Sequence, residues 1–283
     1  HHVTDIAPTL RVVCGIRQPT EVDGTAQRPM DGVSLAYTFD RAHAGAPSRR
    51  IAPGATGARE AAMAESEDLL FKGLKVLDVG TWIAGPVSAT MLADYGADVI
   101  KVETPGMGDP YRMMTSSPLS PRLDYNYPWV LDARNKRGIS LNLKTESGRA
   151  ILMRLVADCD VYITNQPTPT RERFGLTYEQ LAPLNPRMIY ASLSAYGETG
   201  PDAGREGFDA VTWWARSGLM DLVRAQGAAP GGSTPGMGDH PTAVTMYAMI
   251  VTALLRRERT GKGSHVHTSL LHNGIWSNAC HAQ

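Results

Sequence analysis

Short runs rich in valine and isoleucine alternate with longer segments of helical periodicity from Lys75 onward. Such runs, bounded by turn-forming residues, predict strands, and the segments between them predict helices. The expected strands are Lys75–Val79, Asp98–Glu103, Ile139–Leu143, Asp160–Thr164, Met188–Ser194 and His265–Leu270. The expected helices lie near Pro86–Tyr95, Glu146–Ala157, Tyr178–Ala182, Asp209–Leu222 and Thr242–Arg257. This alternation predicts an α/β fold of Rossmann-like type, with a mainly parallel sheet flanked by helices.

The first part of the chain has a different composition. Residues 1–50 contain scattered apolar positions without a sustained period, and residues 51–71 are rich in alanine, glycine and glutamate. Such a composition buries little apolar surface and is typical of linkers or disorder. We therefore expect a poorly structured N-terminal segment over 1–50, a linker over 51–71 and the α/β region over 72–283.

Composition excludes several classes of partner. The 28 acidic residues balance 28 basic ones, which gives no electrostatic reason to expect a nucleic acid or an anionic membrane. The longest apolar run, Ala243–Leu255, falls short of the roughly 20 residues that span a bilayer. The three cysteines lie far apart, which favours a reducing, cytoplasmic setting. His265 and His267 share one strand face, but no third ligand has fitting spacing, so we expect no metal site.

A glycine-rich loop, Gly236–Thr242, carries the strongest candidate for chemistry. It places a lone carboxylate, Asp239, directly before an apolar helix. Gly236 and Gly238 would leave space in front of the carboxylate and offer N–H donors to an oxyanion. A helix start favours a carboxylate anion by roughly 0.3–1 kcal/mol, which leaves its basicity nearly unchanged. The pattern is typical of a nucleophile, and equally of a structural N-cap.

The first strand and helix form a second candidate site. Leu77–Pro86 consists of a strand end, a glycine turn and a helix start, where backbone N–H groups can face a phosphate. Glu103 ends the second strand, about where nicotinamide-binding folds place a ribose-binding acid. The turn lacks the Gly-x-Gly-x-x-Gly spacing, however, so a dehydrogenase is disfavoured and an ordinary βα turn stays open.

Seven segments extend this interpretation. They are Leu74–Asp78 with Ala84–Pro86, Tyr95–Glu103, Asn135–Lys144, Asn185–Ser192, Tyr196–Pro201, Gly238–Asp239 and Arg259–Gly263. In this order they resemble the N-terminal half of the class III CoA-transferases, which include formyl-CoA and carnitine CoA-transferases. The resemblance implies transfer of CoA between an acyl-CoA and a carboxylic acid, without a permanently bound cofactor. It also implies an interlocked homodimer and a longer chain with a further small domain, so residues 72–283 would form an incomplete large domain.

The resemblance also assigns roles to individual residues. It implies that Asp239 is the covalent nucleophile and that a loop beside the thioester contains Trp82, Ile83 and Ala84. A basic cluster around the third strand would meet the phosphates of CoA, or would form a solvated strand edge; it contains Asn135, Lys136, Arg137 and Lys144. By resemblance, the remaining contacts to CoA come from Leu141, with Lys144 close by, and from Asn165, Gln166 and Arg173.

The chain departs from the family pattern at two places. Gln166-Pro167 stands where an aromatic residue and a glycine-rich turn are common, and Thr104 stands where arginine is common. Trp82 fits a core position as well as a binding position.

Two alternative functions remain open. The related α-methylacyl-CoA racemases carry His-Asp where this chain has Phe208-Asp209. Phe208 cannot transfer a proton, so racemisation by that route is disfavoured. The other alternative is a non-catalytic fragment that binds CoA.

Residues 2–49 resemble an internal stretch of arylsulfatases. The stretch lacks the Cys/Ser-x-Pro-x-Arg signature of those enzymes, because Cys14 is followed by Gly-Ile-Arg. Sulfatase activity is therefore not expected. The combination of two partial resemblances suggests a fusion of gene fragments.

Overall fold

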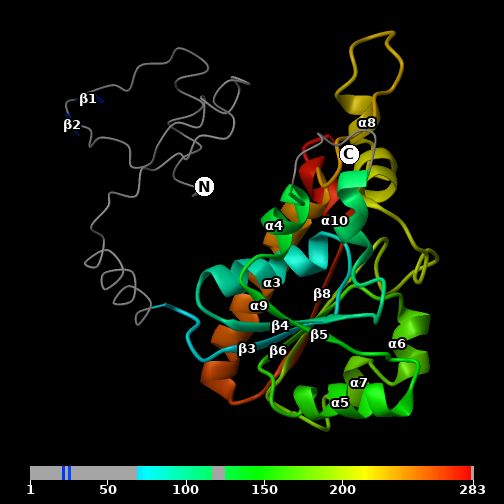
Figure 1. The fold of residues 1–283 in the computed structure, drawn as a ribbon. Helices are drawn as coiled ribbons and strands as arrows, with labels where there is room; N and C mark the ends of the chain where they lie inside the picture. The colour runs from blue at the N-terminus through cyan, green and yellow to red at the C-terminus, as the bar shows by residue number, and fades with distance from the viewer. Residues whose placement is uncertain (1–20, 23–24, 27–68, 117–124, 282–283) are drawn as a thin grey trace. The chain divides into compact units, whose positions relative to one another are not determined.

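The computed structural model describes residues 21–22, 25–26, 69–116 and 125–281 (Figure 1). The chain divides into two units, His1–Glu65 and Ser66–Gln283. In the first unit, strand β1 (Glu21–Val22) pairs antiparallel with β2 (Thr25–Ala26). The rest of the predicted N-terminal segment and most of the predicted linker lie outside the described residues. Their boundaries and the arylsulfatase resemblance therefore stay predictions.

The second unit contains a parallel sheet of six strands. In spatial order these are β5 (Lys136–Ser140), β4 (Asp98–Glu103), β3 (Lys75–Asp78), β6 (Val161–Thr164), β7 (Ile189–Ser194) and β8 (Ser264–Ser269). The chain starts at β3, runs outward to β5, and then returns to the other side of β3 through β6. This arrangement confirms the predicted Rossmann-like α/β fold. Its reversal point lies between β3 and β6, where doubly wound sheets bind ligands at the carboxyl ends of their strands.

Helices cover both faces of this sheet (Figure 1). The helices and helical turns are α3 (Ala84–Asp94), η3 (Pro110–Ser116), α4 (Tyr127–Ala133), α5 (Glu146–Val156), α6 (Thr168–Phe174), α7 (Tyr178–Leu181), η4 (Ala210–Arg216), α8 (Leu219–Leu222), α9 (Asp239–Thr260) and α10 (Leu270–Ser277). One apolar core joins α3 and α9 to the strands, and a second core joins α5 and α7 to the opposite face. Within the described part of the chain, no helix is both long and apolar enough to cross a bilayer.

The third strand begins earlier than the pattern predicts. We expected Ile139–Leu143, whereas β5 spans Lys136–Ser140. Lys136 lies beside Val99 and Ile139 lies beside Val102 in the parallel ladder with β4. The apolar alternation from Ile139 onward was misleading, because the two basic residues before it form the first part of the strand. This shift moves Lys136 and Arg137 to the amino end of the sheet.

Two helices also differ from their predictions. The helix expected over Asp209–Leu222 is divided into the π-helical segment η4 and the short helix α8, since Gly218 adopts a left-handed φ of 90°. Helix α9 begins at Asp239, not at Thr242, so Gly238 is its N-cap and Asp239 its first residue.

Candidate active site at the reversal point of the sheet

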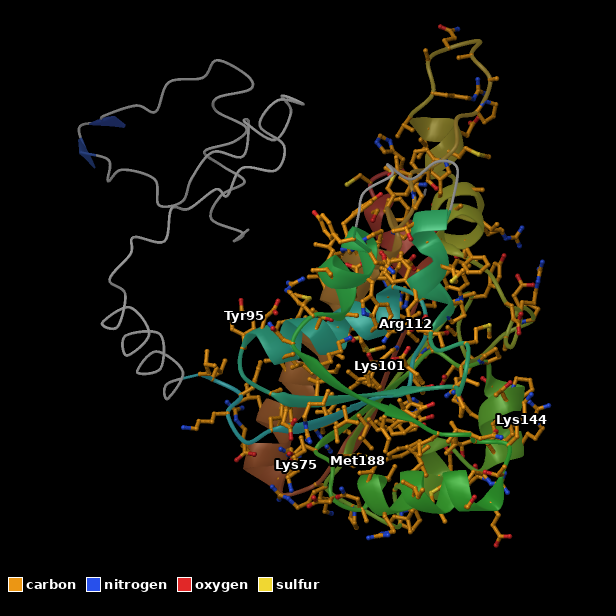
Figure 2. The ribbon with its side chains drawn as sticks, in the orientation of Figure 1. Lys75, Tyr95, Lys101, Arg112, Lys144 and Met188 are labelled. Atoms are coloured by element: carbon orange, nitrogen blue, oxygen red, sulfur yellow. The ribbon has the colours of Figure 1, made fainter. Side chains whose placement is uncertain are left out.

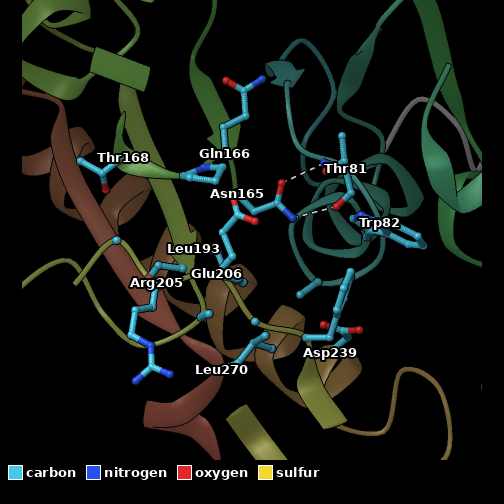
Figure 3. A pocket seen from close by; sticks show the side chains of 17 residues that line it. Thr81, Trp82, Asn165, Gln166, Thr168, Leu193, Arg205, Glu206, Asp239 and Leu270 are labelled. Carbon is cyan, nitrogen blue, oxygen red and sulfur yellow. Dashed lines mark hydrogen bonds between the residues drawn. The ribbon is translucent and has the colours of Figure 1, made fainter. Parts of the chain in front are cut away.

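The side chain of Asn165 fixes the loop that follows β3. Its carboxamide donates a hydrogen bond to the carbonyl oxygen of Thr81 at 2.7 Å and accepts one from the Thr81 N–H at 2.8 Å (Figure 3). A Cβ on Gly80 would lie 3.2 Å from the Asn165 Oδ1 and from the Pro86 Cδ. The glycine therefore permits the close approach of the loop to Asn165. The hydrogen bonds between Asn165 and Thr81 thus join the end of β6 to the loop after β3, at the reversal point of the sheet.

Buried charged side chains stabilise the same loop. Lys101 in β4 donates to the Gly80 carbonyl oxygen at 2.6 Å and forms an ion pair with Asp109 at 2.8 Å. Asp109 in turn accepts a hydrogen bond from the Trp82 N–H at 3.0 Å. Figure 2 shows Lys101 in the interior of the domain, and its side chain is only 3% exposed. Because buried charges are costly unless paired, this network holds the loop in one conformation.

Trp82 adopts an unusual backbone conformation within this loop. Its φ is 64°, in the left-handed region that non-glycine residues rarely occupy. The Trp82 ring contacts the ring of Phe208 edge to face, with centroids 5.3 Å apart. Both side chains line one cavity. Strain of this kind persists where the surrounding contacts enforce it, and it is concentrated at functional sites.

That cavity has a volume of about 290 Å³ and opens at the carboxyl ends of β3, β6 and β7 (Figure 3). Its lining includes Trp82, Ala84, Asn165, Gln166, Leu193, Phe208, Asp239 and Leu270. A second cavity of about 140 Å³ lies over the ends of β3, β4 and β5, and Leu141 belongs to its lining. Thr81 and Gln166 line both cavities, so the two cavities adjoin each other.

Asp239 is the half-buried carboxylate of the first cavity. Among the described residues, its carboxylate has no hydrogen-bond partner. Burial, reinforced by the negative charge of Asp209, raises the pKa of Asp239 from 3.8 to about 7. The expectation that the helix start would leave its basicity unchanged is therefore wrong, because desolvation outweighs the helix. At neutral pH this residue is therefore ionised in only about half of the molecules, and its ionised form is more basic than that of an ordinary aspartate.

Asp209 also holds the loop in front of Asp239. Its Oδ2 accepts a hydrogen bond from the Gly238 N–H at 3.0 Å, and its Oδ1 accepts one from the Ala210 N–H at 2.8 Å. The expected role of the Gly238 N–H as an oxyanion donor does not fit, since this N–H is already bound. A Cβ on Gly238 would lie 2.5 Å from the Trp213 ring, so the glycine allows tight packing of the loop.

His240 completes the surroundings of Asp239. Its Nδ1 lies 2.9 Å from the Gly236 carbonyl oxygen, and its Nε2 lies 3.1 Å from the Asp132 Oδ1. The sequence alone did not single out His240, Asp132 or Asp209 as site residues. A histidine next to the candidate nucleophile was a visible signal, but the two carboxylates reach the site only through the tertiary fold.

The structure separates the two leading members of the predicted basic cluster from both cavities. Lys136 is buried, with its Nζ 2.9 Å from Asp78 and 2.7 Å from the Pro86 carbonyl oxygen. Arg137 is exposed and forms a bidentate ion pair with Asp98 at the amino end of β4. Neither residue lines either cavity, and their role as phosphate ligands stays a prediction.

The other predicted contacts are distributed unevenly. Gln166 and Leu141 line cavities, and Arg171 fixes Gln166 by donating to its carbonyl oxygen at 3.0 Å. Ile83 is buried and forms the N-cap of α3. Neither Lys144 nor Arg173 lines either cavity: Lys144 lies at the surface (Figure 2), and the Arg173 guanidinium lies 4.6 Å from the centroid of the Phe174 ring. Within the described ranges, no three histidine, cysteine or acidic side chains are grouped as metal ligands.

Comparison with known proteins identifies the family. The profile described as CoA-transferase family III matches residues 71–283. The chain belongs to this family. It is 36% identical over 209 residues to the (R)-2-hydroxy-4-methylpentanoate CoA-transferase of Clostridioides difficile, covering 74% of this chain and 52% of that protein. It is 36% identical over 204 residues to the human succinyl-CoA:glutarate CoA-transferase, covering 72% and 46%.

A solved structure of the family has the same fold. The crystal structure of a CAIB/BAIF family protein from Brucella suis superimposes with a TM-score of 0.68 at 36% identity, over 75% of this chain and 56% of that one. The chain thus spans about half the length of the family III relatives that it matches.

Proposed function

We propose that this chain provides the nucleophile and the CoA-binding surface of a family III CoA-transferase, with Asp239 as the covalent nucleophile. The observation that carries the proposal is the environment of Asp239. Its carboxylate faces a cavity at the reversal point of the sheet and has no hydrogen-bond partner among the described residues, and its pKa is raised to about 7 by burial. A basic, partly desolvated carboxylate is a better nucleophile than an exposed one.

The two adjoining cavities suit the two ends of a CoA thioester. In this proposal the thioester lies in the larger cavity, between Asp239 and the loop that contains Trp82 and Ala84. The nucleotide lies toward the smaller cavity, whose lining includes Leu141. Gln166 lines both cavities and would contact the part of CoA that links the thioester to the nucleotide. Lys136 and Arg137 have no part in this binding mode.

The chemistry consists of four exchanges at carbonyl carbons. The Asp239 carboxylate attacks the thioester of the donor, expels CoA thiolate and forms an acyl-aspartyl anhydride. The thiolate then attacks the aspartyl carbonyl, which releases the donor carboxylate and leaves an aspartyl-CoA thioester. The acceptor carboxylate attacks that thioester, giving a second anhydride and free thiolate. Attack of the thiolate on the acceptor acyl group forms the new acyl-CoA and restores Asp239. No net proton is consumed.

Phe208 disfavours the racemase alternative. Its ring lines the same cavity as Asp239 and contacts Trp82. By the resemblance this is the position of the racemase histidine, and a phenyl ring has no transferable proton. One-base exchange at Asp239 would not invert the carbon next to the thioester in both directions.

The test is transfer by the 283-residue chain with acyl-CoA donors and free acids, beginning with the acids named for the relatives, 2-hydroxy-4-methylpentanoate and glutarate. We expect the CoA ester of the acceptor to form. Asp239→Ala should abolish transfer and preserve CoA binding measured by calorimetry, whereas Asp221→Ala on the exposed surface of α8 should change neither. Transfer that persists in Asp239→Ala would contradict the proposal. CoA binding without transfer in the unaltered chain would favour the binding-only alternative.

A further inference from the structure

The imidazole of His240 lies between two hydrogen-bond acceptors. The Gly236 carbonyl oxygen is 2.9 Å from Nδ1, and the Asp132 Oδ1 is 3.1 Å from Nε2. A neutral imidazole has only one N–H, so one ring nitrogen would then present a lone pair to an acceptor. An imidazolium donates to both acceptors. The geometry therefore selects the charged form of this histidine.

Asp132 is fixed as the anionic partner of His240. It is almost fully buried in α4, and its Oδ2 accepts a hydrogen bond from the Tyr111 hydroxyl at 2.5 Å. The Asp132 carbonyl oxygen accepts a further hydrogen bond from the Thr90 hydroxyl at 2.6 Å. Burial raises the pKa of Tyr111, which keeps that hydroxyl protonated and donating. The second carboxylate oxygen is thus left for His240.

The turn before α9 is shaped for this contact. Gly236 has a φ of +77°, and a Cβ at this position would lie 2.8 Å from the His240 Cε1. A side chain there would displace the ring from the Gly236 carbonyl oxygen. The glycine that precedes His240 by one helical turn is therefore part of the arrangement.

His240 follows the nucleophile directly and opposes the charges that surround it. Among the described residues, the negative carboxylates of Asp209 and Asp132 act on Asp239 from η4 and α4, and the Tyr111 hydroxyl lies within electrostatic reach from η3. The two carboxylates disfavour ionisation of Asp239, whereas His240 favours it.

The remaining charged side chains that line the larger cavity belong to one loop. They are Arg205 and Glu206. Arg205 is exposed and forms an ion pair with Asp202 at 2.7 Å, so its charge is already balanced.

We propose that His240 is held as an imidazolium by Asp132 and Gly236, and that it acts as a positioning residue that favours the ionised, attacking form of Asp239. The inference rests on the proposed function for the meaning of that ionisation. Consistent with it, the hydrogen bond to Asp132 raises the pKa of His240. Without the cation, three acidic groups would face one another at the start of α9.

The test follows the ionisation of Asp239 in the 283-residue chain by NMR, with aspartate labelled at the carboxyl carbon. Asp239→Asn identifies the signal. We expect a titration near pH 7 in the unaltered chain. His240→Asn should move the midpoint upward by about one pH unit, because an opposite charge is lost. His240→Lys should return it toward the parent value, and His272→Asn on the exposed face of α10 should leave it unchanged.

Two results would overturn the inference: a midpoint that is unmoved in His240→Asn, or equal midpoints in the asparagine and lysine variants. If His240→Asn does not fold, nitrogen NMR of the histidines in the unaltered chain decides instead. A doubly protonated His240 ring at neutral pH supports the inference, and a single neutral tautomer contradicts it. Neither measurement needs turnover, so a chain that shows the expected titration without CoA transfer would refute the proposed function alone.

Discussion

The carboxylate of Asp209 accepts a hydrogen bond from the backbone N–H of Gly238 at 3.0 Å. This contact fixes the loop before α9 and at the same time brings a second negative charge to Asp239. One residue therefore shapes the site and raises the basicity of the candidate nucleophile. The two effects can be separated by substitution.

Asp209→Asn removes the charge of this residue but keeps most of its volume. We expect the pKa of Asp239 to fall below about 7, since repulsion from Asp209 contributes to the elevation. One amide oxygen cannot accept from both the Gly238 and Ala210 N–H groups as the carboxylate does, which should cost about 1–3 kcal/mol of unfolding free energy. Urea unfolding and the carboxyl titration measure the two effects. An unchanged Asp239 midpoint would refute the electrostatic part.

Asp239 should reduce the stability of the folded chain above neutral pH. Its folded pKa of about 7 lies above the ordinary 3.8, so the folded state binds the proton more tightly than the unfolded chain. The stability gained from protonation is fully present below pH 3.8 and is lost as the pH rises through about 7. The stabilisation by Asp239→Asn should therefore grow by about 3 kcal/mol between pH 5 and pH 8. Urea unfolding at several pH values checks this; a difference that is constant with pH contradicts it.

Lys136 and Arg137 should differ sharply in their effect on stability. Burial alone would raise the pKa of Asp78, but Lys101 and Lys136 outweigh it and hold that pKa below its ordinary value. Lys136→Met leaves Asp78 with one cation, 3.5 Å away, and should cost about 3–5 kcal/mol. Arg137→Met breaks an exposed ion pair and should cost less than about 1 kcal/mol.

Calorimetry with CoA tests whether Arg137 takes part in binding. Arg137→Met should leave the affinity unchanged, because this residue lies at the opposite end of the sheet from the cavities. A clear loss of affinity in Arg137→Met would support the sequence-based role of this residue in phosphate binding.

Asn165→Ala should release the loop that carries Trp82. Both backbone groups of Thr81 lose their partner, which we expect to cost about 1–3 kcal/mol of unfolding free energy. CoA should bind more weakly, since the loop lines both cavities. Thr170→Ala serves as a comparison, because this residue of α6 lines neither cavity. Unchanged stability and affinity in Asn165→Ala would refute the role of Asn165 in fixing this loop.

The sheet was largely predictable from the sequence because its central strands are continuous apolar runs. Val161–Thr164 is buried along its whole length, as its composition suggests. The predicted start of β5 was too late, because Lys136 is buried through an ion pair to Asp78, a residue of another strand. No local pattern reveals such a partner.

The candidate nucleophile was predictable, but its properties were not. The glycine loop and the start of an apolar helix single out Asp239 within a few residues. Its raised pKa depends on burial and on Asp209, which the fold brings to the loop from the segment before η4. The interlocked homodimer and the acids that are exchanged stay predictions.

Covalent trapping at Asp239 tests the central claim most directly. The 283-residue chain is incubated with an acyl-CoA and then with hydroxylamine, and the peptide that contains Asp239 is examined by mass spectrometry. We expect an aspartyl hydroxamate at this residue, formed only in the presence of acyl-CoA and absent from Asp239→Asn. A hydroxamate at another residue, or CoA transfer without any modification at Asp239, would contradict the account.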